Sequence, residues 1–327
     1  MKHLTTAVGI AIVSALLPPA VAEPLSKDIA GRIEAIPIQT LTISDEQFLK
    51  GDAYGKPTTI AGVLRVAQGS GRLPLVILVA GSSGFGPVVD AWDRQFEEMG
   101  ISTFAMDSFA GRGIVSTVVD QSQLGRLNMV LDVYRSLAVL AAHPRVDPTR
   151  IAVMGWSRGG QAALYSSVKR FQKMWNPDGI EPVAYLPLYP ECNMSFIDDA
   201  EVSDRPIMMF HGISDDWVPI ARCQAYLARL QQNSKNNVKL IAFPDTSHAY
   251  DYPDLPTSPT VAKNAQAILC VILEEPLGTM TNTETKKPFT YSDSCVKRDP
   301  HVAYSASSTH ATEEAVKALL KEVFKLN

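Results

Sequence analysis

The chain has 327 residues, of which 46% are hydrophobic and 20% are charged, and its formal net charge at pH 7 is −4. This balance is that of a globular protein with enough apolar material for a sizeable core. The sequence contains no basic run or patch, which argues against a nucleic-acid-binding protein.

The first 22 residues have the pattern of a cleaved secretory signal peptide. A positive charge at Lys2 precedes an apolar stretch, residues 7–17, that is shorter than the ~20 residues needed to span a bilayer. Residues 20–22, Ala-Val-Ala, form a small-residue cleavage site. We therefore expect a mature chain of residues 23–327, without a membrane anchor, in the periplasm or outside the cell.

Eight short segments of the chain are predicted to be β-strands. The first two alternate between apolar and polar residues, as edge strands do, whereas the other six are continuous apolar runs typical of strands covered on both faces. Helical patterns lie between most of them. The sequence thus predicts an α/β fold, with a mostly parallel eight-stranded sheet and helices on both faces. The strand ranges are 36–43, 58–66, 75–80, 101–106, 151–155, 183–188, 207–211 and 238–243.

The spacing of apolar residues also predicts two particular helices, residues 127–140 and a terminal helix over residues 312–326. No stretch resembles a linker, so we expect residues 23–327 to form a single domain. No long insertion is evident between the strands, and we expect a fairly open site.

The motif with the clearest chemical meaning is Gly155-Trp-Ser157-Arg-Gly159. A strand-like run precedes it and a helix-like run follows it, which is the context of a nucleophile elbow. In such an elbow a sharp turn raises the serine hydroxyl above the sheet, and glycines on either side avoid steric clashes. We expect Ser157 to be a nucleophile, with a structural turn as the alternative.

A serine nucleophile needs a base and a carboxylate to orient that base. Asp215 follows the predicted strand 207–211, and His248 follows the strand 238–243, so both occupy the loops where acid and base belong. Either aspartate of the Asp215–Asp216 pair can instead be a loop residue or a helix N-cap, and we expect Asp216 to be the cap. His248 has an alternative role as a surface loop histidine.

A glycine-rich loop, residues 81–86, follows the apolar run 75–80. The backbone N–H groups of such a loop can stabilise an oxyanion. We expect Ser82, with Ser83 as second choice, to donate from this loop, together with the backbone N–H of Arg158. A phosphate-binding loop is disfavoured because neither the Gly-Lys-Ser/Thr ending nor the dinucleotide spacing is present.

Together with the elbow, several further stretches resemble the dienelactone hydrolase family of α/β-hydrolases, in particular a secreted bacterial branch. They are residues 106–113 (MDSFAGRG), 146–150 (VDPTR), 188–192 (LYPEC), 215–219 (DDWVP) followed by Cys223, and 248–251 (HAYD). The resemblance covers roughly residues 40–327. It implies an α/β-hydrolase fold and ester hydrolysis.

Two departures separate this chain from the founding members of the family. Those members use a cysteine nucleophile where this chain has Ser157, and their His-Gly loop after the third strand is Ala80-Gly81 here. Dienelactone itself is therefore doubtful as the substrate. The resemblance also implies that Arg112 binds a substrate carboxylate, because a guanidinium matches a carboxylate in geometry. The alternative is a structural arginine tied to backbone carbonyls.

Four cysteines in an exported chain favour disulfides over a metal site, and none has Cys-x-x-Cys spacing. Three connectivities are open. We favour Cys192–Cys223, because both residues should lie at the catalytic edge of the sheet, and Cys270–Cys295, which would close a polar loop with little apolar material.

These features predict a serine esterase that acts on a small-molecule ester without a metal or organic cofactor. The alternatives are a peptidase or a carbohydrate-ester deacylase using the same site, or an inactive secreted binding protein. Three aromatic residues beside the motifs, Trp156, Trp217 and Tyr250, are candidates for the substrate pocket, although such residues are more often plain packing.

Overall fold

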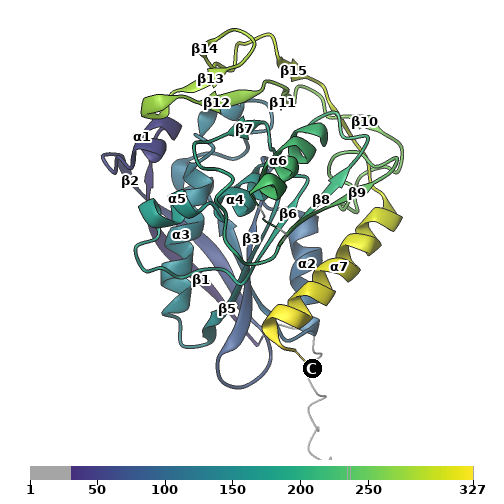
Figure 1. Ribbon diagram of the computed structural model, residues 1–327. Coiled ribbons are helices and arrows are strands. Elements are labelled where there is room, and N and C mark those ends of the chain that lie inside the picture. Colours follow the sequence, from purple (N-terminus) through teal and green to yellow (C-terminus); the bar gives the residue numbers. More distant parts are fainter. Residues whose placement is uncertain (1–30, 234, 236, 327) are drawn as a thin grey trace, which may run out of the picture.

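The computed structural model describes residues 31–233, 235 and 237–326, so the predicted signal peptide lies outside the described residues. An eight-stranded sheet crosses the molecule in the order β1-β2-β4-β3-β5-β6-β8-β9 (Figure 1). The pairs β1–β2 and β2–β4 are antiparallel and all other neighbours are parallel, which confirms the predicted sheet. Its strands are β1 (Arg32–Thr42), β2 (Lys56–Val66), β3 (Leu73–Val79), β4 (Ser102–Asp107), β5 (Val146–Trp156), β6 (Ala184–Leu188), β8 (Ile207–Gly212) and β9 (Val238–Phe243).

The central strands are apolar throughout because both faces of the sheet are covered. In β3, Leu75, Ile77 and Val79 pack into one core cluster, while Val76 and Leu78 pack into the other. The first face is covered by α3 (Asn128–Ala141), α4 (Arg158–Tyr165), α5 (Lys169–Trp175) and α6 (Ala221–Gln232). The second is covered by α2 (Pro87–Glu98) and α7 (Ala306–Phe324), as Figure 1 shows. This arrangement is an α/β three-layer architecture.

The two helices predicted from apolar spacing are present as α3 and α7. Helix α7 begins six residues before the predicted start, because Ser305 caps it: the Ser305 side chain accepts a hydrogen bond from the Ser308 N–H. Its Val316 and Leu320 side chains are fully buried, as the periodicity indicated. A short helix, α1 (Asp45–Lys50), begins with a capping box formed by Ser44 and Gln47.

The site is less open than expected, although the segment that covers it follows the last strand of the sheet and does not interrupt it. Between β9 and α7, residues 249–305 form a series of very short strands that lies above the carboxyl ends of the parallel strands (Figure 1). Runs of two or three residues carry no readable periodicity, which is why the sequence pattern did not reveal them. The strands are β10 (Thr260–Val261), β11 (Gln266–Ile268), β12 (Ile272–Glu274), β13 (Met280–Asn282), β14 (Lys287–Pro288), β15 (Val296–Arg298) and β16 (His301–Val302). A 3-10 helix, η3 (Pro276–Gly278), separates β12 from β13, and β7 (Met194–Ser195) pairs with β12.

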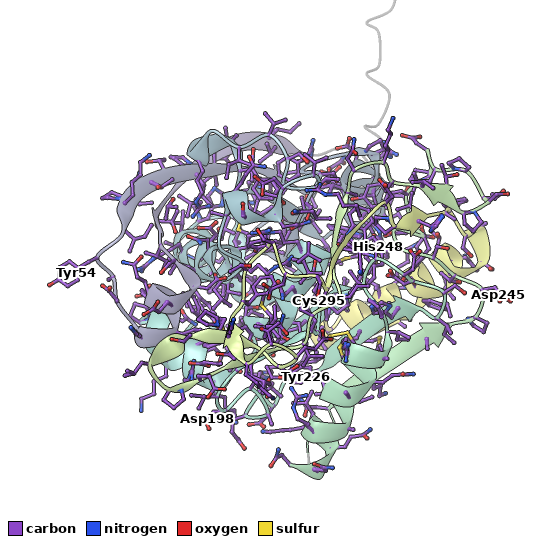
Figure 2. All side chains as sticks on the ribbon, turned by 90° about the horizontal axis from the view of Figure 1, so that it is seen from above. Tyr54, Asp198, Tyr226, Asp245, His248 and Cys295 are labelled. Atoms are coloured by element: carbon purple, nitrogen blue, oxygen red, sulfur yellow. A yellow bond between two sulfur atoms is a disulfide. The ribbon has the colours of Figure 1, made fainter. Side chains whose placement is uncertain are left out.

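Both favoured disulfides are present in the structure. Cys192 and Cys223 join the end of β6 to α6 with a Cα–Cα distance of 5.0 Å. Cys270 and Cys295 link two parts of the 249–305 segment with a Cα–Cα distance of 5.1 Å. In the view from above, Cys295 lies well inside the outline of the molecule (Figure 2). None of the helices among the described residues combines the length and apolar character needed to cross a bilayer.

Candidate active site

Ser157 lies at the sharp turn between β5 and α4, with φ 52° and ψ −115°. A non-glycine residue in this region of backbone space is strained, and such strain gathers at functional positions. A Cβ on Gly159 would lie 2.0 Å from the Val79 carbonyl oxygen, and one on Gly155 would lie 2.2 Å from the Gly159 carbonyl oxygen. The close approach of helix to strand therefore requires both glycines, as the elbow motif predicted.

His248 and Asp215 reach Ser157 from the loops after β9 and β8. The His248 Nε2 lies 3.0 Å from the Ser157 Oγ, and the His248 Nδ1 lies 2.7 Å from the Asp215 Oδ2. Because the carboxylate accepts a hydrogen bond from the Nδ1–H, the lone pair of Nε2 is available to the serine hydroxyl. His248 and Asp215 are both almost fully buried, and in Figure 2 His248 lies within the outline of the molecule.

The loop that holds the carboxylate is organised by Asp215 itself. Its Oδ1 accepts hydrogen bonds from the backbone N–H groups of Trp217 at 3.0 Å and Val218 at 2.7 Å, so Oδ2 is left for the histidine. The expectation that Asp216 caps the next helix was wrong. Helix α6 starts at Ala221 without a side-chain cap, and Asp216 instead accepts from the backbone N–H and the Nδ1 of His301.

The predicted oxyanion loop lies directly against the serine. A Cβ on Gly81 would be 3.5 Å from the Ser157 Cβ, and the neighbouring Ser82 is buried at the pocket wall. Arg158 is the first residue of α4, where helix geometry leaves its backbone N–H without a partner inside the helix. The loop that carries Ser82 and the first turn of α4 thus both border the Ser157 side chain.

A buried polar network braces the oxyanion loop from behind, and the sequence pattern did not indicate it. The Gln121 Nε2 donates to the Ser82 Oγ at 3.0 Å, and its Oε1 accepts from the Arg158 guanidinium at 2.9 Å. The same guanidinium also donates to the Leu124 carbonyl oxygen. Burial, reinforced by repulsion from nearby Arg126, lowers the pKa of Arg158 to about 10. The Arg158 side chain is therefore structural.

The structure corrects the assignment of Arg112 as a carboxylate-binding residue. Its guanidinium makes a two-pronged ion pair with Asp132, at 2.7 and 2.9 Å, and the remaining N–H groups bond to Thr42, to the Leu41 carbonyl and to the Ser108 carbonyl. Only 3% of the side chain is exposed. With every donor engaged inside the protein, Arg112 has none left for a substrate.

Two of the three aromatic candidates for the pocket also belong to the core. Trp156 is fully buried and donates its indole N–H to Asp251 at 2.8 Å, and Tyr250 is fully buried and bonds to Thr312. Neither lines the cavity above Ser157, so assigning them to the pocket was wrong. Trp217 does line that cavity, with its ring centroid 4.9 Å from that of His248.

A buried carboxylate that was not singled out as a site residue, Asp251, supports the site from beneath. It accepts hydrogen bonds from Trp92 at 3.2 Å, from Trp156 at 2.8 Å and from the Tyr189 hydroxyl at 2.6 Å. Burial raises its pKa above the usual range, against the opposing effect of these three donors. The Tyr189 ring lies edge-on to His248, with centroids 4.8 Å apart. In the sequence, Asp251 was marked only by its place in the stretch 248–251 (HAYD).

Among the described residues, one cluster has the spacing of metal ligands: Cys270, Asp293 and Cys295. Its two sulfurs are joined in a disulfide, and metal binding by cysteine requires a thiolate. This cluster is therefore structural.

The sheet order and the elbow between β5 and α4 define the class of the protein as an α/β-hydrolase fold. The family model "Dienelactone hydrolase family" matches residues 61–271, well over half of the chain. The chain belongs to the dienelactone hydrolase family.

Solved structures agree with this fold. A dienelactone hydrolase-like promiscuous phosphotriesterase, P91, from metagenomic libraries has a TM-score of 0.58 at 16% identity, covering 90% of this chain and 99% of its own. A structure named m3DLH has a TM-score of 0.58 at 17% identity, covering 90% of this chain and 100% of its own. At these identities the likeness concerns the fold alone.

Curated relatives match over shorter stretches. The "Probable carboxylic ester hydrolase LipM" of Mycobacterium tuberculosis is 28% identical over 163 residues, which is 37% of this chain and 38% of that protein. The "Probable dipeptidyl-aminopeptidase B" of Paracoccidioides brasiliensis is 28% identical over 138 residues, 36% of this chain and 15% of that protein. The chain therefore spans well under half the length of these relatives.

Proposed function

We propose that this protein is a serine hydrolase that cleaves carboxylic esters through an acyl-enzyme intermediate. The observation that carries the proposal is the hydrogen-bonded chain from Ser157 Oγ to His248 Nε2, 3.0 Å, and from His248 Nδ1 to Asp215 Oδ2, 2.7 Å. Nucleophile, base and orienting carboxylate in this order are the arrangement used for acyl transfer. Membership of a hydrolase family supports the same reaction class.

In the proposed mechanism, His248 Nε2 takes the proton of Ser157 as its oxygen attacks the ester carbonyl carbon. The backbone N–H groups of Ser82 and Arg158 stabilise the oxyanion, and Asp215 stabilises the charged imidazole. The alcohol leaves with the proton that His248 held. A water molecule, deprotonated by the same imidazole, then releases the acid and restores the free serine.

A peptidase is the main alternative, since dipeptidyl-aminopeptidases match part of the chain. A carbohydrate-ester deacylase and an inactive binding protein are the other two. Fold membership does not separate these activities, because specificity depends on the residues around the site. The apolar cavity above Ser157 favours a small ester over a peptide or a sugar ester, since peptides and sugars present many hydrogen-bonding groups.

The test is labelling of the purified protein with a fluorophosphonate probe, followed by peptide mapping. We expect modification at Ser157 that is lost in Ser157→Ala and in His248→Ala, with full labelling of the exposed control Ser292→Ala. A panel of p-nitrophenyl esters should be hydrolysed by the wild type and by Ser292→Ala, but not by Ser157→Ala or His248→Ala. Absence of labelling in folded protein, or full esterase activity in Ser157→Ala, would refute the proposal and favour a binding protein.

We also propose that residues 23–327 act as one exported domain. Two disulfides support an oxidising compartment, because such bonds rarely persist in the cytosol. Cell fractionation and N-terminal sequencing test this proposal. We expect the protein in the periplasmic or culture fraction, beginning at Glu23. Recovery from the cytosol with Met1 intact would contradict it.

A further inference from the structure

A cavity of about 370 Å³ opens directly above Ser157. Its floor is made by Ser157, His248 and the oxyanion loop, and its sides are apolar. The carbon-rich lining comes from three separate parts of the chain: Val118, Trp217 and, in the 249–305 segment, Leu255, Val261, Ala262 and Val302. Four of these six residues belong to the 249–305 segment, which therefore forms the roof of the pocket.

The aromatic residues of the wall have their polar atoms engaged in hydrogen bonds within the protein. The Trp217 indole N–H donates to the Gln266 carbonyl at 2.9 Å, and the Tyr189 hydroxyl donates to Asp251 at 2.6 Å. Tyr252 hydrogen-bonds to the Ser83 side chain, and burial raises its pKa to about 12. Their polar groups are thus satisfied without a ligand, and their rings add apolar surface to the wall.

No Asp, Glu, Lys or Arg side chain lines this cavity among the described residues. The guanidinium of Arg158, next to Ser157 in the chain, is held by Gln121. That of Arg298 donates to the carbonyl oxygens of Asn264 and of Val119, which follows Val118 in the chain. The carboxyl groups closest behind the wall are Asp215 and Asp251. A substrate carboxylate entering here would lose its water without meeting a cation, which is strongly unfavourable in a dry pocket.

The roof is fixed to the proposed catalytic loops. Val302 forms a β-bridge with His248, and the backbone N–H of Ala303 donates to the His248 carbonyl oxygen. His301, next to Val302, bonds to Asp216 at 2.7 Å, and Asp216 directly follows Asp215. The apolar surface is thus held at a defined position relative to the scissile bond.

We propose that the pocket selects uncharged esters with a short apolar or single-ring acyl group, and that the roof residues of the 249–305 segment determine this specificity. The proposal rests on the proposed esterase function of Ser157. Esters that carry a carboxylate on the acyl chain are discriminated against. A cavity of about 370 Å³ is near the lower end of the ~300–1,000 Å³ typical of ligand pockets, so long fatty chains do not fit inside it.

The test compares three p-nitrophenyl esters: the butyrate, the hemisuccinate, which carries a carboxylate, and the methyl-capped hemisuccinate, which restores neutrality. We expect kcat/KM to be roughly 100-fold lower for the hemisuccinate than for the butyrate, and to recover largely with the methyl cap. Similar kcat/KM values for the butyrate and hemisuccinate would overturn the proposal. A methyl-capped ester as poor as the hemisuccinate would overturn it too, because size rather than charge would then be selected.

A variant of the roof gives a second, independent test of the proposal. Val261 is 49% exposed at the mouth of the pocket, so Val261→Arg should fold. The added cation should raise kcat/KM for the hemisuccinate about fivefold and lower kcat/KM for the butyrate. Val139→Arg, on the outer face of α3 and 38% exposed, is the matched control and should change neither value. Equal effects of both variants would overturn the role of the roof.

The esters and the probe separate failure of the two proposals. If the probe labels Ser157 but the butyrate is not hydrolysed, the substrate class is wrong and Ser157 keeps its role. If Ser157 is not labelled and none of the esters is cleaved, both proposals fail. Hydrolysis of the butyrate that persists in Ser157→Ala would refute the proposed nucleophile.

Discussion

Replacing Asp251 tests whether the buried carboxylate under the site acts through its hydrogen bonds or through its charge. In Asp251→Ala, the N–H groups of Trp92 and Trp156 and the hydroxyl of Tyr189 lose their acceptor. Each unsatisfied buried donor costs about 1–3 kcal/mol, and removal of the buried carboxylate offsets part of the sum. We expect a net loss of about 3–5 kcal/mol in the free energy of unfolding.

Asp251→Asn should be much milder than Asp251→Ala. The amide oxygen can accept from both indoles, and the Tyr189 hydroxyl can rotate to accept from the amide nitrogen. The burial penalty that raises the pKa of Asp251 also disappears. We therefore expect Asp251→Asn to stay within about 1 kcal/mol of the wild type, and the exposed control Asp254→Ala within about 0.5 kcal/mol.

The measurement is urea denaturation of the four proteins, repeated between about pH 4 and pH 7. A carboxyl whose folded pKa is raised contributes stability below its unfolded pKa, and this contribution is lost as pH rises through the folded pKa. The wild type should therefore lose stability relative to Asp251→Asn as pH rises. If Asp251→Asn is as unstable as Asp251→Ala at pH 7, the site needs the negative charge and the hydrogen-bond reasoning is refuted.

Three further results are expected. Asp215→Asn should lower kcat for p-nitrophenyl butyrate by about 10⁴-fold with an unchanged circular dichroism spectrum, and a loss under tenfold would contradict its orienting role. Gly159→Ala, whose Cβ would lie 2.0 Å from a carbonyl oxygen, should lower the free energy of unfolding by at least about 3 kcal/mol. Gly86→Ala, with open space around its Cβ, should lower it by under about 1 kcal/mol. Denaturation curves of the two variants that coincide would refute the steric reasoning. Replacing Cys270 and Cys295 together by alanine should cost about 3.5 kcal/mol, from the 25-residue loop that they close, and unchanged unfolding would show that this bridge contributes nothing.

The sequence by itself was sufficient to predict the sheet and the chain order of the candidate site. Strands covered on both faces must be apolar throughout, so their positions are visible in the sequence. The glycines around Ser157 and the loop positions of Asp215 and His248 are equally local signals, because each depends on the residues beside it. The favoured pair Cys192–Cys223 followed from the same predicted topology, and Cys270–Cys295 from the scarcity of apolar residues in the loop that it closes.

Only the tertiary structure decided which polar side chains are free to meet a substrate. Arg112 is a plausible carboxylate ligand in sequence, but its partner Asp132 lies on a different element, and no local pattern joins the two. Asp216 likewise pairs with His301, 85 residues away. Such assignments depend on long-range packing, which pairs residues irrespective of their local spacing.

The roof of the pocket is the other feature that depended on the tertiary structure. Its strands are two or three residues long and are held by a disulfide, by bridges to distant elements and by Asp216, so they have no amphipathic period of their own. Local sequence encodes the elbow that carries Ser157, because steric limits act between neighbouring residues. The apolar, uncharged surface above it arises only when segments far apart in the chain are packed together.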